Sequence, residues 1–203
     1  MRNIGVYGGT FDPIHKGHAR LLELAKREYG LDKVIVMPDR IPPHKQREDM
    51  ASPEDRLEMC RLAFAGRDDI EVSDYEIRQE GKSYSVLTLR HLKKLYPEDR
   101  LWFIMGSDML TSFTQWYCYE EILTLAGLIC LTRYRGDRDE LEAAAEVLRE
   151  KGGEIRLLPA DAFEVSSSQL RELIAQGGDL SGYLSDRVKE YINSKGLYRK
   201  REG

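Results

Sequence analysis

The chain has 203 residues, 41% of them hydrophobic and 33% charged, and a formal net charge of −4 at pH 7. That length suits one domain, 1–203, whose core needs no disulfide or metal support. The slightly acidic balance excludes a bulk basic field that would recruit nucleic acid or a membrane surface. Since Cys60, Cys118 and Cys130 lack CxxC spacing and no targeting or membrane-spanning segment is evident, we expect a cytoplasmic enzyme with buried free thiols.

A pair of glycines follows the first apolar run. The run from Ile4 to Tyr7 predicts a buried strand, which ends at Gly8 and Gly9. Glycine lets the backbone turn tightly and approach a ligand closely. Because a short glycine motif is weak evidence, a simple turn and a ligand-binding loop both remain open at this point.

A helix with two histidines is expected directly after these glycines. Pro13 suits the first helical position, and Asp12 suits the capping position before it. His15 and His18 are three residues apart, so they would share one face of the helix. Helix amides, a glycine turn and two imidazoles facing one place predict a site for an anion, and we expect a phosphate.

The rest of the chain alternates strands and helices. Apolar runs predict further strands at 33–37, 70–73, 101–105, 128–131 and 154–158, with 101–105 buried on both faces. Helices are expected up to Gly30, from Pro53, over 83–96, up to Ala126, over 139–151 and in a small C-terminal helical segment at about 165–203. This order predicts an α/β fold, a Rossmann-like doubly wound parallel sheet with helices on both faces. Its ligand would lie beyond the carboxyl ends of the strands.

Polar segments follow several of these strands. The proline-rich stretch after the second strand contains His44 and Lys45, and we expect a flexible arm over the ligand crevice rather than a solvated loop. Asp108 follows Gly106 closely, after the fourth strand. At this position its carboxylate suits either of two roles: accepting hydrogen bonds from a ribose or capping a turn. The segment 165–171 places three serines at a helix start and Arg171 in the first turn, which favours a phosphate site over helix capping alone.

The chain resembles the bacterial nicotinate-nucleotide adenylyltransferase family, within the nucleotidylyltransferase superfamily. The superfamily motifs are GGTFDPIHKGH at 8–18, whose HxGH element is shared with class I aminoacyl-tRNA synthetases, and VSSSQLR at 165–171. The motifs similar to this family in particular are PPHK at 42–45, SYSVLTL at 83–89, and GSDML with the following Trp116. The resemblance therefore runs along nearly the whole chain.

The resemblance implies a set of ATP-binding residues: Gly8, Gly9, Thr10, Phe11, His15, His18, Gly106, Asp108, Ser167, Ser168 and Arg171. The catalytic residues among them would be His15, His18 and Arg171, joined by Lys45 from the loop. Asp108 would hold the adenylate ribose.

The resemblance also implies that nicotinate mononucleotide is the acceptor. Trp116 would stack on its ring, and backbone amides near Ser85 and Tyr117 would receive its carboxylate. His44 and Lys45 would approach phosphates from their loop. These five residues would form the acceptor side of the site.

Two positions depart from the SYTVDTL that such proteins often carry. Ser85 stands in place of the threonine, and a backbone contact survives that change. Leu87 stands in place of the aspartate, so whatever that aspartate would bond must be satisfied otherwise.

The residues suit nucleotidyl transfer, which relies mainly on in-line positioning and neutralisation of charge. Imidazoles, helix amides, Lys45 and Arg171 supply positive charge and hydrogen-bond donors, and no nucleophile is evident. We therefore expect direct attack of the mononucleotide phosphate on the α-phosphorus of ATP, with release of pyrophosphate. Mg²⁺ should arrive with ATP, with no metal ligands from the protein.

Several alternatives stay open or are disfavoured. Nicotinamide mononucleotide or pantetheine phosphate could be the acceptor, and a non-catalytic nucleotide-binding module would bind ATP without releasing pyrophosphate. A dinucleotide-dependent oxidoreductase is disfavoured because the glycines lack GxGxxG spacing. An aminoacyl-tRNA synthetase is disfavoured by the length of the chain and the lack of a KMSKS-like loop. Whether the chain forms a homo-oligomer is left open by the sequence.

Overall fold

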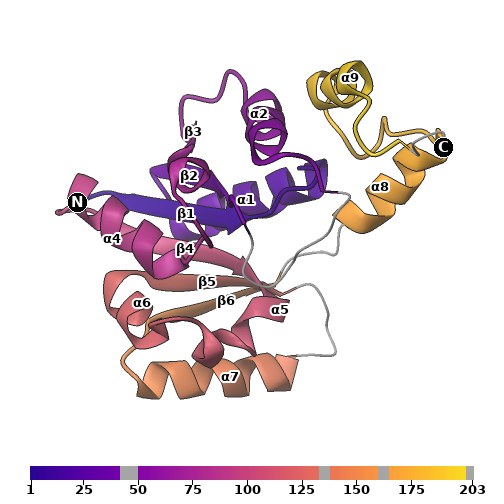
Figure 1. Cartoon of the computed structure of the whole chain (residues 1–203). Coiled ribbons are helices and arrows are strands. Elements are labelled where there is room, and N and C mark those ends of the chain that lie inside the picture. The colour runs from indigo at the N-terminus through magenta and orange to yellow at the C-terminus, as the bar shows by residue number, and fades with distance from the viewer. Residues whose placement is uncertain (42–49, 133–137, 160–164, 200–203) are drawn as a thin grey trace.

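A parallel sheet of six strands lies at the centre of the chain (Figure 1). The computed structural model describes residues 1–41, 50–132, 138–159 and 165–199, and the statements below concern these residues. The strands are β1 (Asn3–Gly9), β2 (Lys33–Pro38), β3 (Ile70–Val72), β4 (Arg100–Gly106), β5 (Gly127–Thr132) and β6 (Ile155–Pro159). Their order is β3-β2-β1-β4-β5-β6, and every neighbouring pair is parallel. This order confirms the predicted Rossmann-like doubly wound fold.

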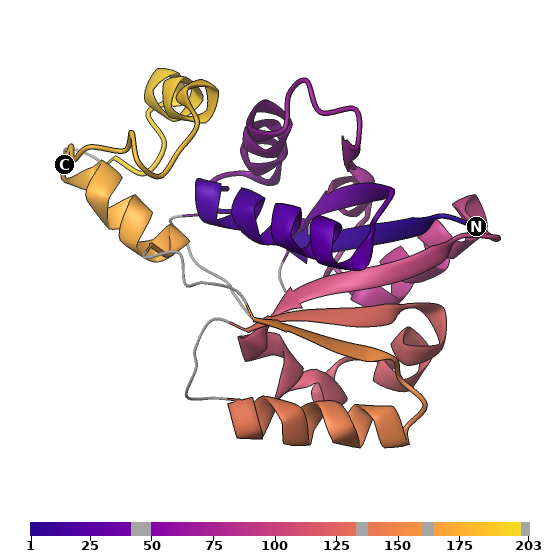
Figure 2. The same ribbon diagram turned by 180° about the vertical axis from the view of Figure 1, so that it is seen from behind.

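Helices cover both faces of the sheet. They are α1 (Lys16–Tyr29), α2 (Pro53–Ala63), α3 (Tyr75–Arg78), α4 (Ser85–Leu95), α5 (Ser107–Leu110), the 3₁₀ helix η1 (Phe113–Gln115), α6 (Tyr119–Leu125), α7 (Arg138–Glu150), α8 (Ser167–Ala175) and α9 (Asp186–Lys195). Figure 2 shows α1 lying along one face of the sheet. Apolar side chains of α1, α2, α8 and α9 pack into one buried cluster, whereas those of α4, α6 and α7 pack into a second. The sheet therefore has a core on each side.

The side chains of β4 alternate between these two cores. Trp102 and Ile104 belong to the first cluster. Leu101, Phe103 and Met105 belong to the second. All of them are buried, which confirms that this strand is covered on both faces.

The first helix starts later than the sequence predicted. Helix α1 begins at Lys16, and its N-cap is His15, whose backbone is extended at φ −142° and ψ 169°. The prediction of Pro13 as first helical residue and Asp12 as cap was wrong, because Asp12 bonds to residues outside the helix. Its carboxylate accepts hydrogen bonds from the backbone amide of Ala51 and the hydroxyl of Tyr198.

Other predicted boundaries agree closely with the structure. Gly30 ends α1 in the left-handed conformation at φ 57°, and Ser52 caps α2 by accepting the amide of Asp55. Ser166 caps α8 in the same way, so one of the three serines serves the helix. The short helices α3, α5 and η1 were not predicted, since they are too short for an apolar period to show.

Two of the three cysteines are buried, as expected. Burial raises the pKa of the Cys130 thiol to about 12 and also raises that of Cys60. Cys118 is only half-buried, so the expectation of three buried thiols was wrong for this residue. Among the described residues, the helices all fall short of the length and apolar character needed to cross a membrane.

Candidate active site

A pocket of about 650 Å³ lies at the carboxyl ends of β1 and β4. These neighbouring strands are where the strand order reverses, the usual ligand position in a doubly wound sheet. The volume is within the range of small-molecule binding sites. The ends of both strands and the starts of α1, α4 and α8 all contribute to its lining.

Every predicted site residue in the described part of the chain lines this pocket. They are Gly8, Gly9, Thr10, Phe11, His15, His18, Ser85, Gly106, Asp108, Trp116, Tyr117, Ser167, Ser168 and Arg171. His44 and Lys45 lie outside the described residues. The structure thus brings together residues that are more than 150 positions apart, such as His15 and Arg171.

The rings of His15 and His18 lie against each other, tilted, at the start of α1. Their ring centroids are 3.7 Å apart, with 31° between the ring planes. His15 Nδ1 accepts the backbone amide of Gly17 at 3.1 Å, and His18 Nδ1 accepts the backbone amide of His15 at 3.2 Å. Since Nδ1 is an acceptor in both rings, we assign the proton of each neutral imidazole to Nε2. Each ring is therefore fixed with a donor at its other nitrogen.

The glycines before the histidines are the last residues of β1. The strand ends at Gly9, which agrees with the prediction that it ends at this glycine pair. A Cβ on Gly9 would lie 2.9 Å from the ring of Phe11, which has a φ of 47°. Close packing of this ring on bare backbone is the local reason for glycine at position 9. The Phe11 ring also makes an edge contact with His18, at 5.2 Å between centroids.

A buried arginine that the sequence did not single out supports this segment. The side chain of Arg56 is 1% exposed and donates to the carbonyls of Thr10 at 2.8 Å and Arg40 at 3.0 Å. It also pairs with Asp39 Oδ1 at 2.9 Å, while Asp39 Oδ2 accepts the Thr10 hydroxyl at 2.8 Å. A buried charge is stable only when it is paired in this way. The hydroxyl of Thr10 is thus engaged with Asp39.

The start of α8 is joined to the loop between β1 and α1. Ser167 donates its hydroxyl to the carbonyl of Pro13 at 3.1 Å. Arg171 Nη1 donates to the carbonyl of Asp12, and Nη2 donates to the hydroxyl of Ser168 at 2.9 Å. Arg171 Nε is buried and has no hydrogen-bond partner among the described residues. A buried unpaired donor is costly, and a phosphate oxygen is an acceptor that would satisfy it.

The pocket lining also contains aromatic and polar groups. The ring of Trp116 packs against Phe113 at 5.1 Å between centroids. Ser85 is the first residue of α4, whose N-cap, Tyr84, makes no side-chain capping bond. Uncapped amides at a helix start favour an anionic group. Asp108 is exposed within the short α5, where its carboxylate is accessible to a ligand.

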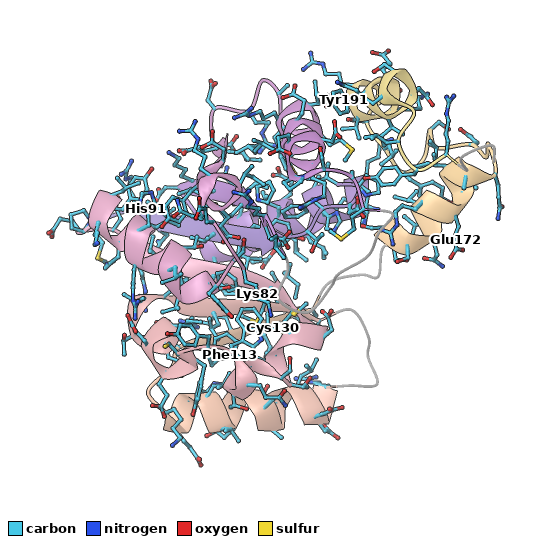
Figure 3. The ribbon with its side chains drawn as sticks, in the orientation of Figure 1. Lys82, His91, Phe113, Cys130, Glu172 and Tyr191 are labelled. Carbon is cyan, nitrogen blue, oxygen red and sulfur yellow. The ribbon has the colours of Figure 1, made fainter. Side chains whose placement is uncertain are left out.

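Glu76 is a pocket residue that sequence reasoning missed. It is buried, lines the pocket and accepts the hydroxyl of Thr88 at 2.5 Å. Burial raises the pKa of Glu76 to about 7, against the lowering effect of hydrogen bonds from Thr88 and Ser83. Its position just after β3, at the carboxyl edge of the sheet, was the available signal. Lys82, near the middle of the molecule in Figure 3, also lines the pocket.

Leu87, the departure from the family pattern, does not line the pocket. Its side chain is 43% exposed on α4. The next residue, Thr88, is the one that bonds to Glu76. The substitution of leucine for aspartate therefore changes an exposed position rather than the pocket lining.

Comparisons with known proteins agree on one family. The cytidylyltransferase-like family matches residues 6–173. A probable nicotinate-nucleotide adenylyltransferase of Desulfatibacillum aliphaticivorans is 36% identical over 215 residues, which cover 96% of this chain and 99% of the relative. The nicotinate-nucleotide adenylyltransferase of Bacillus subtilis is 37% identical over 200 residues, which cover 98% of this chain and 99% of the relative.

A solved structure has the same fold. The nicotinic acid mononucleotide adenylyltransferase of Plasmodium falciparum, complexed with NaAD, has a TM-score of 0.79 and covers 98% of both chains. Its sequence identity is 21%, so this likeness concerns the fold alone. Taken with the sequence relatives, it leads to one conclusion: the chain belongs to the cytidylyltransferase-like family and, within it, to the nicotinate-nucleotide adenylyltransferases.

Proposed function

We propose that the protein joins nicotinate mononucleotide to the adenylate of ATP, giving deamido-NAD and pyrophosphate. The observation that carries this proposal is the convergence of His15, His18 and Arg171 on one pocket that also contains Trp116 and the start of α4. Donors for phosphates, an aromatic ring and the start of a helix without a side-chain cap thus line the same pocket. This arrangement suits a triphosphate next to an aromatic acid.

The reaction we propose is a single in-line displacement. A phosphate oxygen of the mononucleotide attacks the α-phosphorus of ATP, and the bond from that phosphorus to the leaving pyrophosphate oxygen breaks. Nε2 of His15 and His18 and the guanidinium of Arg171 stabilise the charge that develops on the phosphate oxygens. Ser168 holds the guanidinium in place through its hydroxyl.

We propose that Mg²⁺ comes with ATP and is held by the triphosphate oxygens. The described residues contain no cluster of three or more His, Cys, Asp or Glu that could hold a metal ion. The pocket carboxylates of Asp12 and Asp39 are already engaged by donors from the protein. An ion bound mainly by substrate phosphates needs few protein ligands, and it would reduce the negative charge on ATP. As the compartment of this reaction we propose the cytoplasm.

A comparison of acceptors tests the function. Nicotinate mononucleotide, nicotinamide mononucleotide and pantetheine phosphate would each be incubated with ATP and Mg²⁺, with pyrophosphate release and product mass as readouts. We expect deamido-NAD from the first acceptor at the highest kcat/KM. Equal or better turnover with another acceptor would contradict the substrate, and ATP binding without pyrophosphate release would identify a non-catalytic module.

A further inference from the structure

The segment after α9 contacts the loop between β1 and α1 through Tyr198. This residue follows α9 and has a φ of 62°, a left-handed conformation that is uncommon outside glycine. Its hydroxyl donates to Asp12 Oδ1 at 2.6 Å, across 186 positions of sequence. The amide of Ala51 donates to the same oxygen at 3.1 Å. Asp12, a residue only 5% exposed, is therefore held at one carboxylate oxygen by two separate segments.

Asp12 also contacts the catalytic arginine. Its backbone carbonyl accepts Arg171 Nη1, but its other carboxylate oxygen, Oδ2, stays 3.5 Å from that nitrogen. Charge-assisted bonds between arginine and a carboxylate are normally about 2.7–2.9 Å long. Asp12 and Arg171 thus form a buried ion pair at 3.5 Å in which the carboxylate accepts no hydrogen bond from the guanidinium. Together with the unpaired Nε, this leaves hydrogen-bond donors of Arg171 available to an anion.

We propose that Tyr198 is a positioning residue for adenylate transfer: by holding Asp12 Oδ1, its hydroxyl keeps the carboxylate from a close pair with Arg171 and so leaves that arginine to the substrate phosphate. The inference rests on the proposed function. Burial and the neighbouring Asp12 raise the pKa of Tyr198, so the hydroxyl stays a donor throughout the working pH range. Phenylalanine keeps the ring and removes the donor, and the carboxylate then gains a bond by moving onto Arg171.

A second tyrosine offers a matched control. Tyr191, on α9 in Figure 3, donates its hydroxyl to Asp55 Oδ1 at 2.8 Å. It also ties the C-terminal helices to the rest of the chain, but its partner Asp55, unlike Asp12, does not line the pocket. Both Tyr198→Phe and Tyr191→Phe remove one tyrosine–aspartate hydrogen bond. We expect Tyr198→Phe to lower kcat/KM for ATP about tenfold, whereas Tyr191→Phe stays within twofold of the unmodified protein.

A double mutant separates positioning from general support. If Tyr198 acts through Arg171, Tyr198→Phe adds no further loss of kcat/KM to the Arg171→Ala variant. A further tenfold loss in that background would overturn the inference, as would equal effects of the two tyrosine variants. An unmodified protein that is inactive with nicotinate mononucleotide and ATP would refute the proposed function instead.

A binding measurement tests the role of Tyr198 without relying on turnover. Calorimetric titration with a non-hydrolysable ATP analogue should give a several-fold weaker Kd for Tyr198→Phe than for Tyr191→Phe. In an Asp12→Asn background, where no charge draws the guanidinium away, Tyr198→Phe should leave that Kd unchanged. A Kd that weakens equally in both backgrounds would contradict the role of the Asp12 carboxylate.

Discussion

His15 and His18 each use one ring nitrogen in a backbone hydrogen bond, and the other ring nitrogen remains for a ligand in the pocket. Nδ1 of each ring accepts a backbone amide at the start of α1, which fixes the ring and leaves the proton on Nε2. The same two residues thus cap the helix and present donors whose orientation is set before ATP binds.

Replacement of His18 by alanine should mainly affect the chemical step. We expect His18→Ala to lower kcat by about 10²- to 10³-fold, the typical effect of losing one donor to the transition state. Loss of its bond to the His15 amide should cost about 1 kcal/mol of stability. The control is His91→Ala, because the ring of His91 stacks on Tyr75, with 3.8 Å between ring centroids, and His91 does not line the pocket. Retained kcat with a normal KM would contradict the role of His18.

Arg171 should contribute a charged contact to phosphate. We expect Arg171→Ala to cost about 1.5–3 kcal/mol in transition-state binding, calculated from kcat/KM for ATP. Arg90→Ala is the control, because Arg90 pairs with Glu121 on the surface, where such pairs contribute little. Unchanged ATP affinity and rate in Arg171→Ala would remove this residue from the site.

The sequence predicted pocket residues that lie in compact motifs and missed those that support them. Arg56 bonds to Thr10 across 46 positions, and Tyr198 bonds to Asp12 across 186. An isolated arginine on a helix and a tyrosine near the end of a chain have many ordinary uses, so no local pattern indicates such partners. Only the packing of α2 and the C-terminal segment against the first loop creates these contacts.

At the scale of elements, apolar patterns predicted strands well and helix starts less well. A strand such as β4 is fixed by burial on both faces, which its unbroken apolar run reports directly. The start of α1 depends instead on which side chain reaches the first free amides. Aspartate is a preferred N-cap residue, but the carboxylate of Asp12 accepts hydrogen bonds from Ala51 and Tyr198 instead. His15 therefore caps the helix.

Packing between β4 and β5 gives a prediction at the same scale. Gly127 is opposite Trp102 in the sheet, and a Cβ there would lie 2.5 Å from the indole ring. We expect Gly127→Ala to lower the free energy of unfolding by about 1–3 kcal/mol, because the ring is packed in the core and has to shift. Urea unfolding measures this loss.

The matched control for Gly127→Ala is Gly182→Ala. A Cβ on Gly182 would meet no atom within 4 Å, so its free energy of unfolding should change by less than about 0.5 kcal/mol. Equal losses in the two variants would show that the indole ring does not restrict position 127.

For the molecule as a whole, the sequence indicated the edge at which the site forms but not the full set of groups there. Alternating strands and helices predicted a parallel sheet, and parallel strands bring their carboxyl ends to one edge. The order across the sheet places β1 beside β4, and the segments after these strands contain His15 and Asp108. Burial of Glu76 in the same pocket depends on how α3 and α4 pack, which a short strand and a four-residue helix do not reveal.

This buried carboxyl group makes global stability depend on pH. The pKa of Glu76 is raised from 4.5 to about 7 in the folded chain, so the unfolded chain loses this proton first as pH rises. Stability from this group is complete below pH 4.5 and is lost as pH rises through 7, by up to about 3 kcal/mol.

Glutamine is neutral at every pH, so Glu76→Gln should remove this decline in stability. Urea unfolding should show that the variant gains much more stability relative to the unmodified protein at pH 8 than at pH 5. As a control, Glu121→Gln should show no such change across that interval, because Arg90 lowers the pKa of Glu121 and the carboxylate stays charged. A stability difference between Glu76→Gln and the unmodified protein that is equal at both pH values would show that Glu76 is ionised in the folded protein at pH 5.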